Sequence, residues 1–369
     1  MAPDTVRLGV VGLGGMGRRH ADNAAAHGHA VVAGADVSAD AREAFADAHG
    51  ARTYADHEAM LDAVDLDAVV VATPNALHAP AVRAALAVDC HVLCEKPLAD
   101  SLEAAESVAA AAADSEGSVT VGFNKRFHAG TAVAKAYQRA GRLGDVTDVE
   151  ADFVRRRGLP GRDSWFHSPE LAGGGVVLDV GVHVLHLALW LTDFPAVESV
   201  SATTRRTYTP RTEYADPDGF AAAWGEGGDD GGGAGGRPAD ECVEDGATAL
   251  VRTEGPTITL DLAWASNRPP RERLRLDGTE AGAEFDLDAD AMTLYEADTA
   301  GVDHYRTSEV TGEYAPGGWE RMTTTFCDAV AAGHAPAVNG LEEALAVQRV
   351  LDAVYRSAEA GREVTVRDD

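Results

Sequence analysis

The sequence predicts an α/β domain with a doubly wound parallel sheet over residues 1–123, followed by an α+β domain with a large, mainly antiparallel sheet over residues 124–369. Three observations support this fold class. A glycine-rich turn joins a strand to a helix near the start of the chain, strand and helix patterns then alternate, and long alternating strands replace them after residue 124. A chain of 369 residues is also too long for one small core.

The glycine-rich turn lies between an apolar, β-branched run at residues 6–11 and an Ala-rich helix that ends at Gly28. Gly12, Gly14 and Gly17 have the G-x-G-x-x-G spacing, and Met16 lies in the same turn. Gly12 allows a tight turn, Gly14 lets the backbone approach a pyrophosphate, and Gly17 lets the helix pack against the strand. This pattern predicts a dinucleotide site of the Rossmann type, with a purely structural turn as the alternative.

Asp36 predicts which dinucleotide binds. It ends the second apolar run, nineteen residues after Gly17. A carboxylate at this position accepts hydrogen bonds from both ribose hydroxyls and repels a 2′-phosphate, so we expect NAD. Ser38 and Arg42 lie close by in sequence and leave NADP possible.

The rest of the first domain alternates between helix and strand. Asp56 is expected to cap a short helix, and Asp100 with Glu103 forms a capping-box-like pattern at the start of a later one. The loops after two of the strands, at residues 73–78 and 95–98, lie where such sheets bind ligands. Helices are expected over 39–49, up to residue 63 and up to residue 114, and strands over 66–72, 91–94 and 119–122.

The second domain shows the period of an antiparallel sheet. In residues 257–265, Ile258, Leu260, Leu262 and Trp264 share one face, and polar residues alternate with them. The second face of the sheet is expected to be solvated or used for self-association as a homo-oligomer. A Gly/Asp-rich insertion at about 215–244 is expected to be a flexible loop. Similar strands are expected near 149–155, 197–206, 247–253 and 291–296, with helices over 131–140 and 341–360.

The charge balance restricts the partners. The net charge is −29, the pI is near 4.7, and only three of the cationic residues are lysines. Such a surface repels nucleic acid and anionic membranes and suits a halophile, with a GC-rich, acid-biased composition as the alternative. The four cysteines form no disulfide framework. We find no leader and no apolar run of membrane-spanning length, so we expect a cytoplasmic protein.

Residues 173–186 carry the strongest pattern in the second domain. A run of three glycines leads into an apolar helix on which Asp179, His183 and His186 recur at i, i+4 and i+7, on one face. His is the side chain with a pKa suited to take a hydroxyl proton, and an adjacent carboxylate can orient it. Core histidines are one alternative, and a metal site of these three residues is another, although we expect no metal.

Lys96 supplies a complementary group. It follows a strand within Glu-Lys-Pro, and a cation there can hydrogen-bond an oxygen that becomes carbonyl-like during hydride transfer.

Four ordered segments together resemble the Gfo/Idh/MocA family of NAD(P)-dependent sugar and polyol oxidoreductases: GLGGMG at 12–17, ATPNALH at 72–78, CEKPLA at 94–99 and GGGVVLDVGVH at 173–183. The resemblance implies that Lys96, Asp179 and His183 are catalytic and that Lys96–Pro97 is a cis peptide. It also implies that the cofactor is bordered by Thr73, Asn75, His78 and Glu95.

Three further residues are candidates for contact with the substrate. His186 stands where the family often carries an acid. Arg157 and Trp165 are candidates to line the sugar pocket, with a strand-surface charge and a core aromatic as the alternatives.

The function expected from these residues is an NAD-dependent dehydrogenase acting on a sugar, inositol or related polyhydroxy substrate, with His183 as general acid/base. Two alternatives share the fold. One is a glycoside hydrolase that retains NAD and oxidises its substrate transiently, and the other is a non-catalytic regulator that senses NAD or sugar. The three catalytic candidates argue against the regulator, because a sensor needs neither a base nor a polarising cation.

Overall fold

The computed structural model describes residues 5–161, 164–217, 241–312 and 317–366. The chain forms two compact units. The first comprises residues 1–123, 170–173 and 318–348, and the second comprises residues 124–169, 174–317 and 349–369. The first unit thus includes two segments that the sequence analysis placed in the second domain. Residues 218–240 of the predicted Gly/Asp-rich loop lie outside the described residues. At the end of that segment, Cys242, Val243 and Glu244 are buried, so the prediction of a flexible loop is wrong there.

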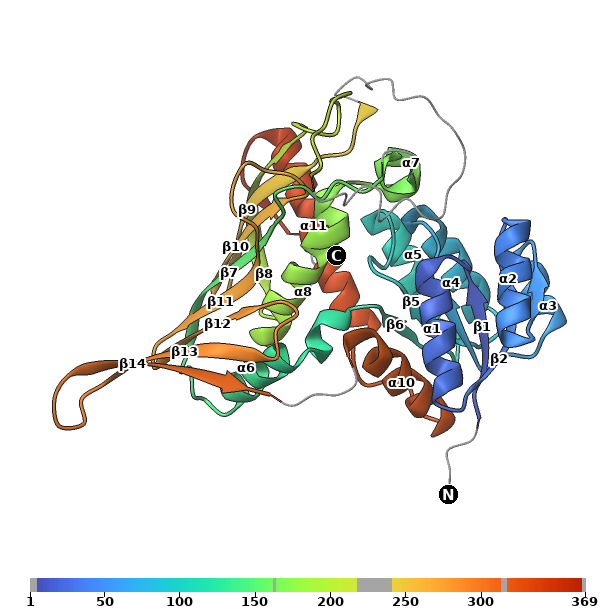
Figure 1. The fold of residues 1–369 in the computed structure, drawn as a ribbon, viewed down its shortest axis with the longest axis horizontal. Coiled ribbons are helices and arrows are strands. Elements are labelled where there is room, and N and C mark those ends of the chain that lie inside the picture. The colour runs from blue at the N-terminus through green and yellow to red at the C-terminus, as the bar shows by residue number, and fades with distance from the viewer. Residues whose placement is uncertain (1–4, 162–163, 218–240, 313–316, 367–369) are drawn as a thin grey trace. The chain divides into compact units, whose positions relative to one another are not determined.

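The first unit contains a fully parallel sheet, as the sequence predicted, and β1, β2, β5 and β6 of this sheet are labelled in Figure 1. The sheet has six strands in the order β3-β2-β1-β4-β5-β6. The strand order changes direction between the neighbours β1 and β4. Doubly wound sheets bind nucleotides at such a switch point. The strands are β1 (Arg7–Val11), β2 (Ala30–Ala35), β3 (Arg52–Tyr54), β4 (Ala68–Val71), β5 (His91–Cys94) and β6 (Val119–Val121).

Capping residues mark where several helices of this unit begin or end. Asp56 accepts a hydrogen bond from the Ala59 amide, as predicted, and Gly50 ends α2 in the left-handed region with φ +65°. The predicted Asp100–Glu103 capping box is wrong. Ser101 adopts the extended N-cap conformation, and its hydroxyl accepts the Ala104 amide, because the helix begins one residue later. The helices are α1 (Gly15–Ala26), α2 (Ala39–His49), α3 (His57–Ala63), α4 (His78–Leu86), α5 (Leu102–Ala113) and α10 (Gly318–Ala331).

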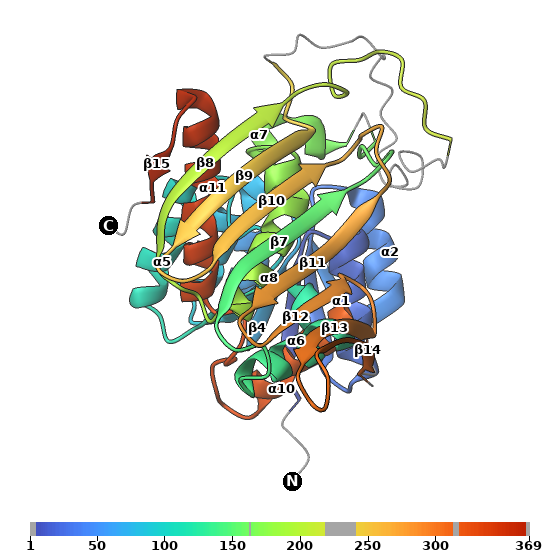
Figure 2. The ribbon, with the colours of Figure 1, turned by 90° about the vertical axis from the view of Figure 1, so that its left-hand side faces the viewer.

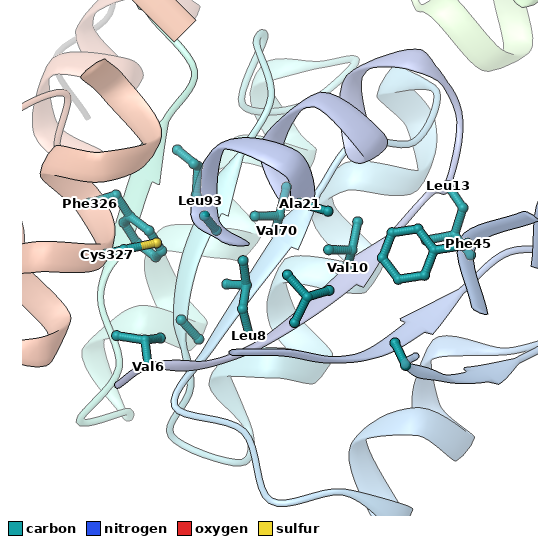
Figure 3. Packing of buried hydrophobic residues seen from close by; sticks show 14 residues of the cluster. Val6, Leu8, Val10, Leu13, Ala21, Phe45, Val70, Leu93, Phe326 and Cys327 are labelled. Atoms are coloured by element: carbon teal, nitrogen blue, oxygen red, sulfur yellow. The ribbon is translucent and has the colours of Figure 1, made fainter. Parts of the chain in front are cut away.

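The core of the first unit joins segments far apart in sequence. Leu8 and Val10 of β1 are fully buried together with Phe45 of α2. Phe326 and Cys327 of α10 belong to the same cluster, and Figure 3 shows them beside Leu93 of β5. Helix α10 therefore completes the core of the first unit, although it follows the whole second sheet in the sequence.

The second unit contains a nine-stranded sheet, shown face-on in Figure 2, with the order β14-β13-β12-β11-β7-β10-β9-β8-β15. All neighbouring strands are antiparallel except β10 and β7, which confirms the mainly antiparallel prediction. Helices α6 (Ala129–Arg139) and α8 (Val182–Leu191) lie behind the sheet in Figure 2. The strands are β7 (Val146–Val154), β8 (Val197–Arg205), β9 (Gly246–Thr253), β10 (Thr257–Ala263), β11 (Arg271–Gly278), β12 (Ala281–Asp286), β13 (Ala291–Asp298), β14 (His304–Thr311) and β15 (Val364–Thr365).

A short helix, a three-residue helical turn and a long helix lie outside these sets of elements. A four-residue helix, α7 (Pro169–Ala172), precedes the glycine run, and a three-residue turn, η3 (Trp165–His167), precedes α7. Helix α11 (Leu341–Ala360) begins in the first unit and continues into the second from residue 349.

One helical segment has the length and composition of a membrane span, contrary to the sequence analysis. Residues Pro169–Leu191 reach a mean hydropathy of 1.7, and the whole apolar window is buried inside the protein. Such burial is typical of a core helix.

Cross-strand ion pairs connect the central strands of the second sheet. Arg273 of β11 lies 3.2 Å from Asp152 of β7, and Arg275 lies 2.9 Å from Glu150. Arg271 reaches Asp261 of β10 at 3.1 Å. This ladder concentrates arginine on the sheet and neutralises part of its acidic surface.

We expect the thermal midpoint to rise by roughly 5–10 °C as KCl increases from about 0.1 M to about 2 M. The net charge of −29 repels itself, and salt screens that repulsion. Salt also weakens the partly exposed ladder, but each such pair contributes only about 0–1 kcal/mol. Circular dichroism melts at several KCl concentrations test this. A midpoint that falls with salt would show that the ion pairs outweigh the net repulsion.

Candidate active site

The glycine turn of the first unit contains two kinds of glycine: those that close packing requires and those that border open space. Gly12 has φ +88°, and a Cβ there would lie 2.5 Å from the Ala72 carbonyl oxygen. A Cβ on Gly17 would lie 1.9 Å from the Gly12 carbonyl oxygen. At Gly14 and Gly15 a Cβ would meet nothing within 4 Å, and no side chain caps α1. The turn thus leaves room for a phosphate group at the start of α1.

Asp36 is held rigidly beside this turn. Its Oδ2 accepts the Leu13 amide at 2.7 Å, and its Oδ1 accepts the Ser38 amide at 2.8 Å. Arg42 donates to the carbonyl oxygens of Asp36 and Val37 at 2.7 and 3.0 Å. The carboxylate that the sequence assigned to the ribose is therefore fixed, and the Arg42 guanidinium, which comes from α2, contacts the backbone of the same loop.

His78 connects the loops that follow β4 and β5, and Asn75 connects the first of these loops to α7. The Nε2 of His78 lies 2.8 Å from the Thr73 carbonyl oxygen, and its Nδ1 lies 2.7 Å from that of Pro97. Burial lowers the pKa of His78, although both carbonyl contacts act in the opposite direction. Asn75 is also buried and donates to the Ala172 carbonyl at 2.8 Å. These contacts indicate that both residues shape the predicted cofactor loops from within.

Glu95 forms a buried polar chain next to Lys96. Its Oε1 lies 2.9 Å from His20 Nε2, and His20 Nδ1 lies 2.7 Å from the Thr323 hydroxyl on α10. The Glu95 Oε2 accepts the Lys96 amide at 3.2 Å. Burial alone would raise the pKa of Glu95, but the hydrogen bond and charge of His20, together with Lys96, bring it below its usual value. The Lys96–Pro97 peptide is cis, as the resemblance implied.

In the second unit, the segment that carries Asp179 and His183 is not a regular α-helix. Residues Val177–Gly181 form a π-helical turn (η4) that continues directly into α8, and such turns are frequent at functional sites. The Asp179 Oδ2 accepts the indole N–H of Trp264 at 2.9 Å. From residue 174 to 191, every residue is buried except His183, which is half-buried. The sequence alone does not predict the π-turn or the role of Trp264.

The remaining candidates, His186, Trp165 and Arg157, differ in burial and in their contacts. His186 is 1% exposed, with its ring 6.0 Å from that of Phe194, which places it in the core. Trp165 stacks on Phe166 with 4.0 Å between ring centroids, and it is only partly buried, so it is not a core aromatic. Arg157 donates to the carbonyl oxygens of Ala215 and Ser266 and to the Asn267 side chain, at 2.7–3.0 Å. Its guanidinium also lies over the rings of Tyr208 and Tyr214.

A metal site has no support among the residues that the structure describes, which contain no group of three His, Cys, Asp or Glu side chains placed to hold an ion.

Comparison with known proteins decides the family. Residues 6–123 match the family model described as an oxidoreductase family with an NAD-binding Rossmann fold, and residues 131–284 match the GFO/IDH/MocA C-terminal domain. The chain belongs to the Gfo/Idh/MocA family. This Gfo/Idh/MocA protein is accordingly an oxidoreductase whose first unit binds NAD through a Rossmann fold.

Similar proteins of this family cover nearly the whole chain. D-xylose 1-dehydrogenase (NADP(+)) 2 of Haloferax volcanii is 33% identical over 97% of this chain and 98% of its own. D-glucoside 3-dehydrogenase of Escherichia coli is 28% identical, covering 90% of this chain and 89% of its own. The crystal structure of an oxidoreductase domain protein from Kribbella flavida has a TM-score of 0.81 and 25% identity, covering 99% and 100% of the two chains.

Replacing Asp36 by Ser should raise the ratio of kcat/KM with NADP to kcat/KM with NAD by about 100-fold. The substitution removes a fixed negative charge, and the juxtaposition of like charges costs several kcal/mol. Initial rates with each cofactor measure the ratio. As a matched control, Asp40→Ser in the first turn of α2 should change it by less than about twofold. An unchanged ratio in Asp36→Ser would show that Arg42 already accommodates the 2′-phosphate.

Proposed function

We propose that this Gfo/Idh/MocA protein is an NAD-dependent dehydrogenase that oxidises a hydroxyl-bearing carbon of a sugar, inositol or related polyhydroxy compound, or catalyses the reverse reduction. The single observation that carries the proposal is His183. It is the one residue of the segment 174–191 that is not buried, and it follows Asp179, whose carboxylate is held by Trp264. A half-buried imidazole on an otherwise buried helix is suited to exchange a proton with a substrate.

The residues of the first unit fit the cofactor. The open space at Gly14 and the start of α1 suit the pyrophosphate, and the fixed Asp36 carboxylate suits the ribose hydroxyls. Bound NAD would accept a hydride at C4 of its nicotinamide. Glu95, Asn75 and His78 would hold the surrounding loops.

The proton steps are assigned to the chain's own side chains. His183 takes the proton from the reacting hydroxyl in oxidation and returns it in reduction, and Asp179 orients and stabilises its imidazolium. Lys96 donates a hydrogen bond to the same oxygen as it becomes a carbonyl. The names of the D-xylose and D-glucoside dehydrogenases support a carbohydrate substrate.

We also propose an oligomeric state and a cellular location for this protein. The charged ladder on the second sheet would suit a polar interface between copies of this chain, and we propose a cytoplasmic homo-oligomer with neither nucleic acid nor membrane as a partner. Light scattering on the eluting protein measures the oligomeric state, and a monomer would contradict the proposal.

The test of the activity is nicotinamide absorbance in molar KCl, with NAD and then NADP, against aldoses, glucosides, inositols and sugar acids. We expect turnover with one of these classes. Tight NAD binding without net turnover of any of them would contradict a dehydrogenase and favour an NAD-retaining hydrolase or a sensor.

A further inference from the structure

Glu244, just before β9, is a buried carboxylate that receives several hydrogen bonds from one place. It is 1% exposed. The Gly175 amide donates to its Oε1 and Oε2 at 2.9 and 3.0 Å, and the Val177 amide donates to Oε1 at 3.0 Å. The Tyr355 hydroxyl of α11 donates to Oε1 at 2.9 Å. The side chain thus holds the backbone where the π-turn with Asp179 begins.

The backbone at Glu244 holds the same segment by a second route. The Glu244 carbonyl accepts the Val176 amide at 3.0 Å, and the carbonyl of the next residue, Asp245, accepts the Trp264 amide at 3.0 Å. The Trp264 indole in turn donates to Asp179 at 2.9 Å. Two chains of contacts therefore run from residues 244–245 to Asp179, one through the start of its helix and one through its carboxylate.

The glycine run before the π-turn is explained by this packing. A Cβ on Gly174 would lie 2.0 Å from the Tyr355 hydroxyl oxygen, and a Cβ on Gly175 would lie 2.0 Å from the Glu244 carbonyl oxygen. A side chain at either position would push the backbone away from Glu244. The glycines thus let Glu244 and Tyr355 approach the backbone closely.

A buried carboxylate is a costly way to satisfy a helix start. The N-cap residues of α2, α5 and α3 are Ser38, Ser101 and Asp56, and all three are exposed. Burial of Glu244 raises its pKa, which reflects the free energy spent on removing the carboxylate from water. In exchange for this loss of hydration, the backbone becomes rigid, because several short hydrogen bonds to one carboxylate fix it in one place.

We propose that Glu244 is a positioning residue of the active site, which fixes the start of the π-turn and through it the orientation of Asp179 and His183. The inference rests on the proposed acid–base roles of those two residues. Glu244 itself takes no part in proton transfer.

The test is Glu244→Gln, which keeps the shape of the side chain but turns one acceptor into a donor that faces the Gly175 amide. We expect kcat to fall about 10- to 100-fold, with the KM and the NAD dissociation constant changed less than about twofold. The pH profile of kcat/KM should shift as well. Tyr355→Phe removes only one of the donors, keeps the carboxylate, and should lower kcat in the same direction by less.

A second readout does not depend on activity. The chain has five tryptophans, and the Trp264 indole N–H resonance can be assigned by its loss in Trp264→Phe. We expect Glu244→Gln to shift this resonance and leave that of Trp190 in place, even if the enzyme acts on no substrate tested. An unmoved Trp264 resonance, or a loss of kcat matched by an equal loss of NAD affinity, would overturn the proposal. If Glu244→Gln does not fold, the same two readouts on Tyr355→Phe decide.

Discussion

Replacing His183 by Ala is expected to lower kcat about 10²- to 10⁴-fold, the range that a positioned general acid or base contributes. The substitution removes the one side chain between residues 174 and 191 that is not buried, and Ala leaves no group there to exchange a proton. Because NAD is assigned to the first unit, the NAD dissociation constant should change less than about twofold. Steady-state rates and NAD titration on the same preparation measure both quantities.

Two matched variants separate acid–base chemistry from general damage. His91 lies at the amino end of β5, where its Nδ1 is 2.8 Å from the Ser118 hydroxyl, so His91→Ala should leave kcat within about twofold. Asp179→Asn keeps an acceptor for the Trp264 indole but removes the charge, and should lower kcat and alter its pH dependence. Retention of more than about one tenth of kcat in His183→Ala would assign the proton transfer elsewhere.

Much of the fold was predictable because it depends on local sequence. The parallel strands appear as apolar runs, Asp56 and Gly50 mark helix ends, and alternation identifies strands such as β10. The pairing of β10 with β7 was not predictable, because parallel and antiparallel strands share the same side-chain period. The packing of α10 in the core of the first unit was not predictable either, because it depends on contacts between residues far apart in the sequence.

The same distinction applies to the site. Lys96, Asp179 and His183 stand out within short motifs, so the sequence could nominate them. Glu244 is separated from Gly175 by 69 residues, and Trp264 from Asp179 by 85, so nothing in either neighbourhood predicts the contact.

The position of His20 could be predicted from the sequence, but its hydrogen-bond partners could not. It lies in α1, the helix that follows the glycine turn. Its hydrogen-bond partners are Glu95, directly after β5, and Thr323 of α10. Only the folded chain shows that a histidine of the first helix supports the loop of Lys96. Supporting residues of this kind are identified by tertiary contacts, whereas groups that carry the chemistry tend to occur in short recognisable motifs.

Substituting Ala for single glycines in the first turn should separate folding from cofactor binding. In Gly17→Ala the new methyl would lie 1.9 Å from a backbone oxygen, so α1 must move away from β1. We expect the free energy of unfolding to fall by roughly 3 kcal/mol or more, and NAD binding to be lost with it. Denaturant unfolding without cofactor measures the first effect, and NAD titration measures the second.

Gly14→Ala should give the opposite combination. Its methyl would meet no protein atom within 4 Å, and the backbone there is extended with φ −71°, so the fold should tolerate it. The same methyl would occupy space assigned to the pyrophosphate, and overpacking of about 1–3 kcal/mol corresponds to NAD binding weakened by about 5- to 150-fold. Gly15→Ala also points into open space, but within the helix, so it should leave stability and NAD affinity nearly unchanged. If Gly14→Ala binds NAD as tightly as the parent protein, the pyrophosphate does not lie against this turn, and the G-x-G-x-x-G pattern here serves packing alone.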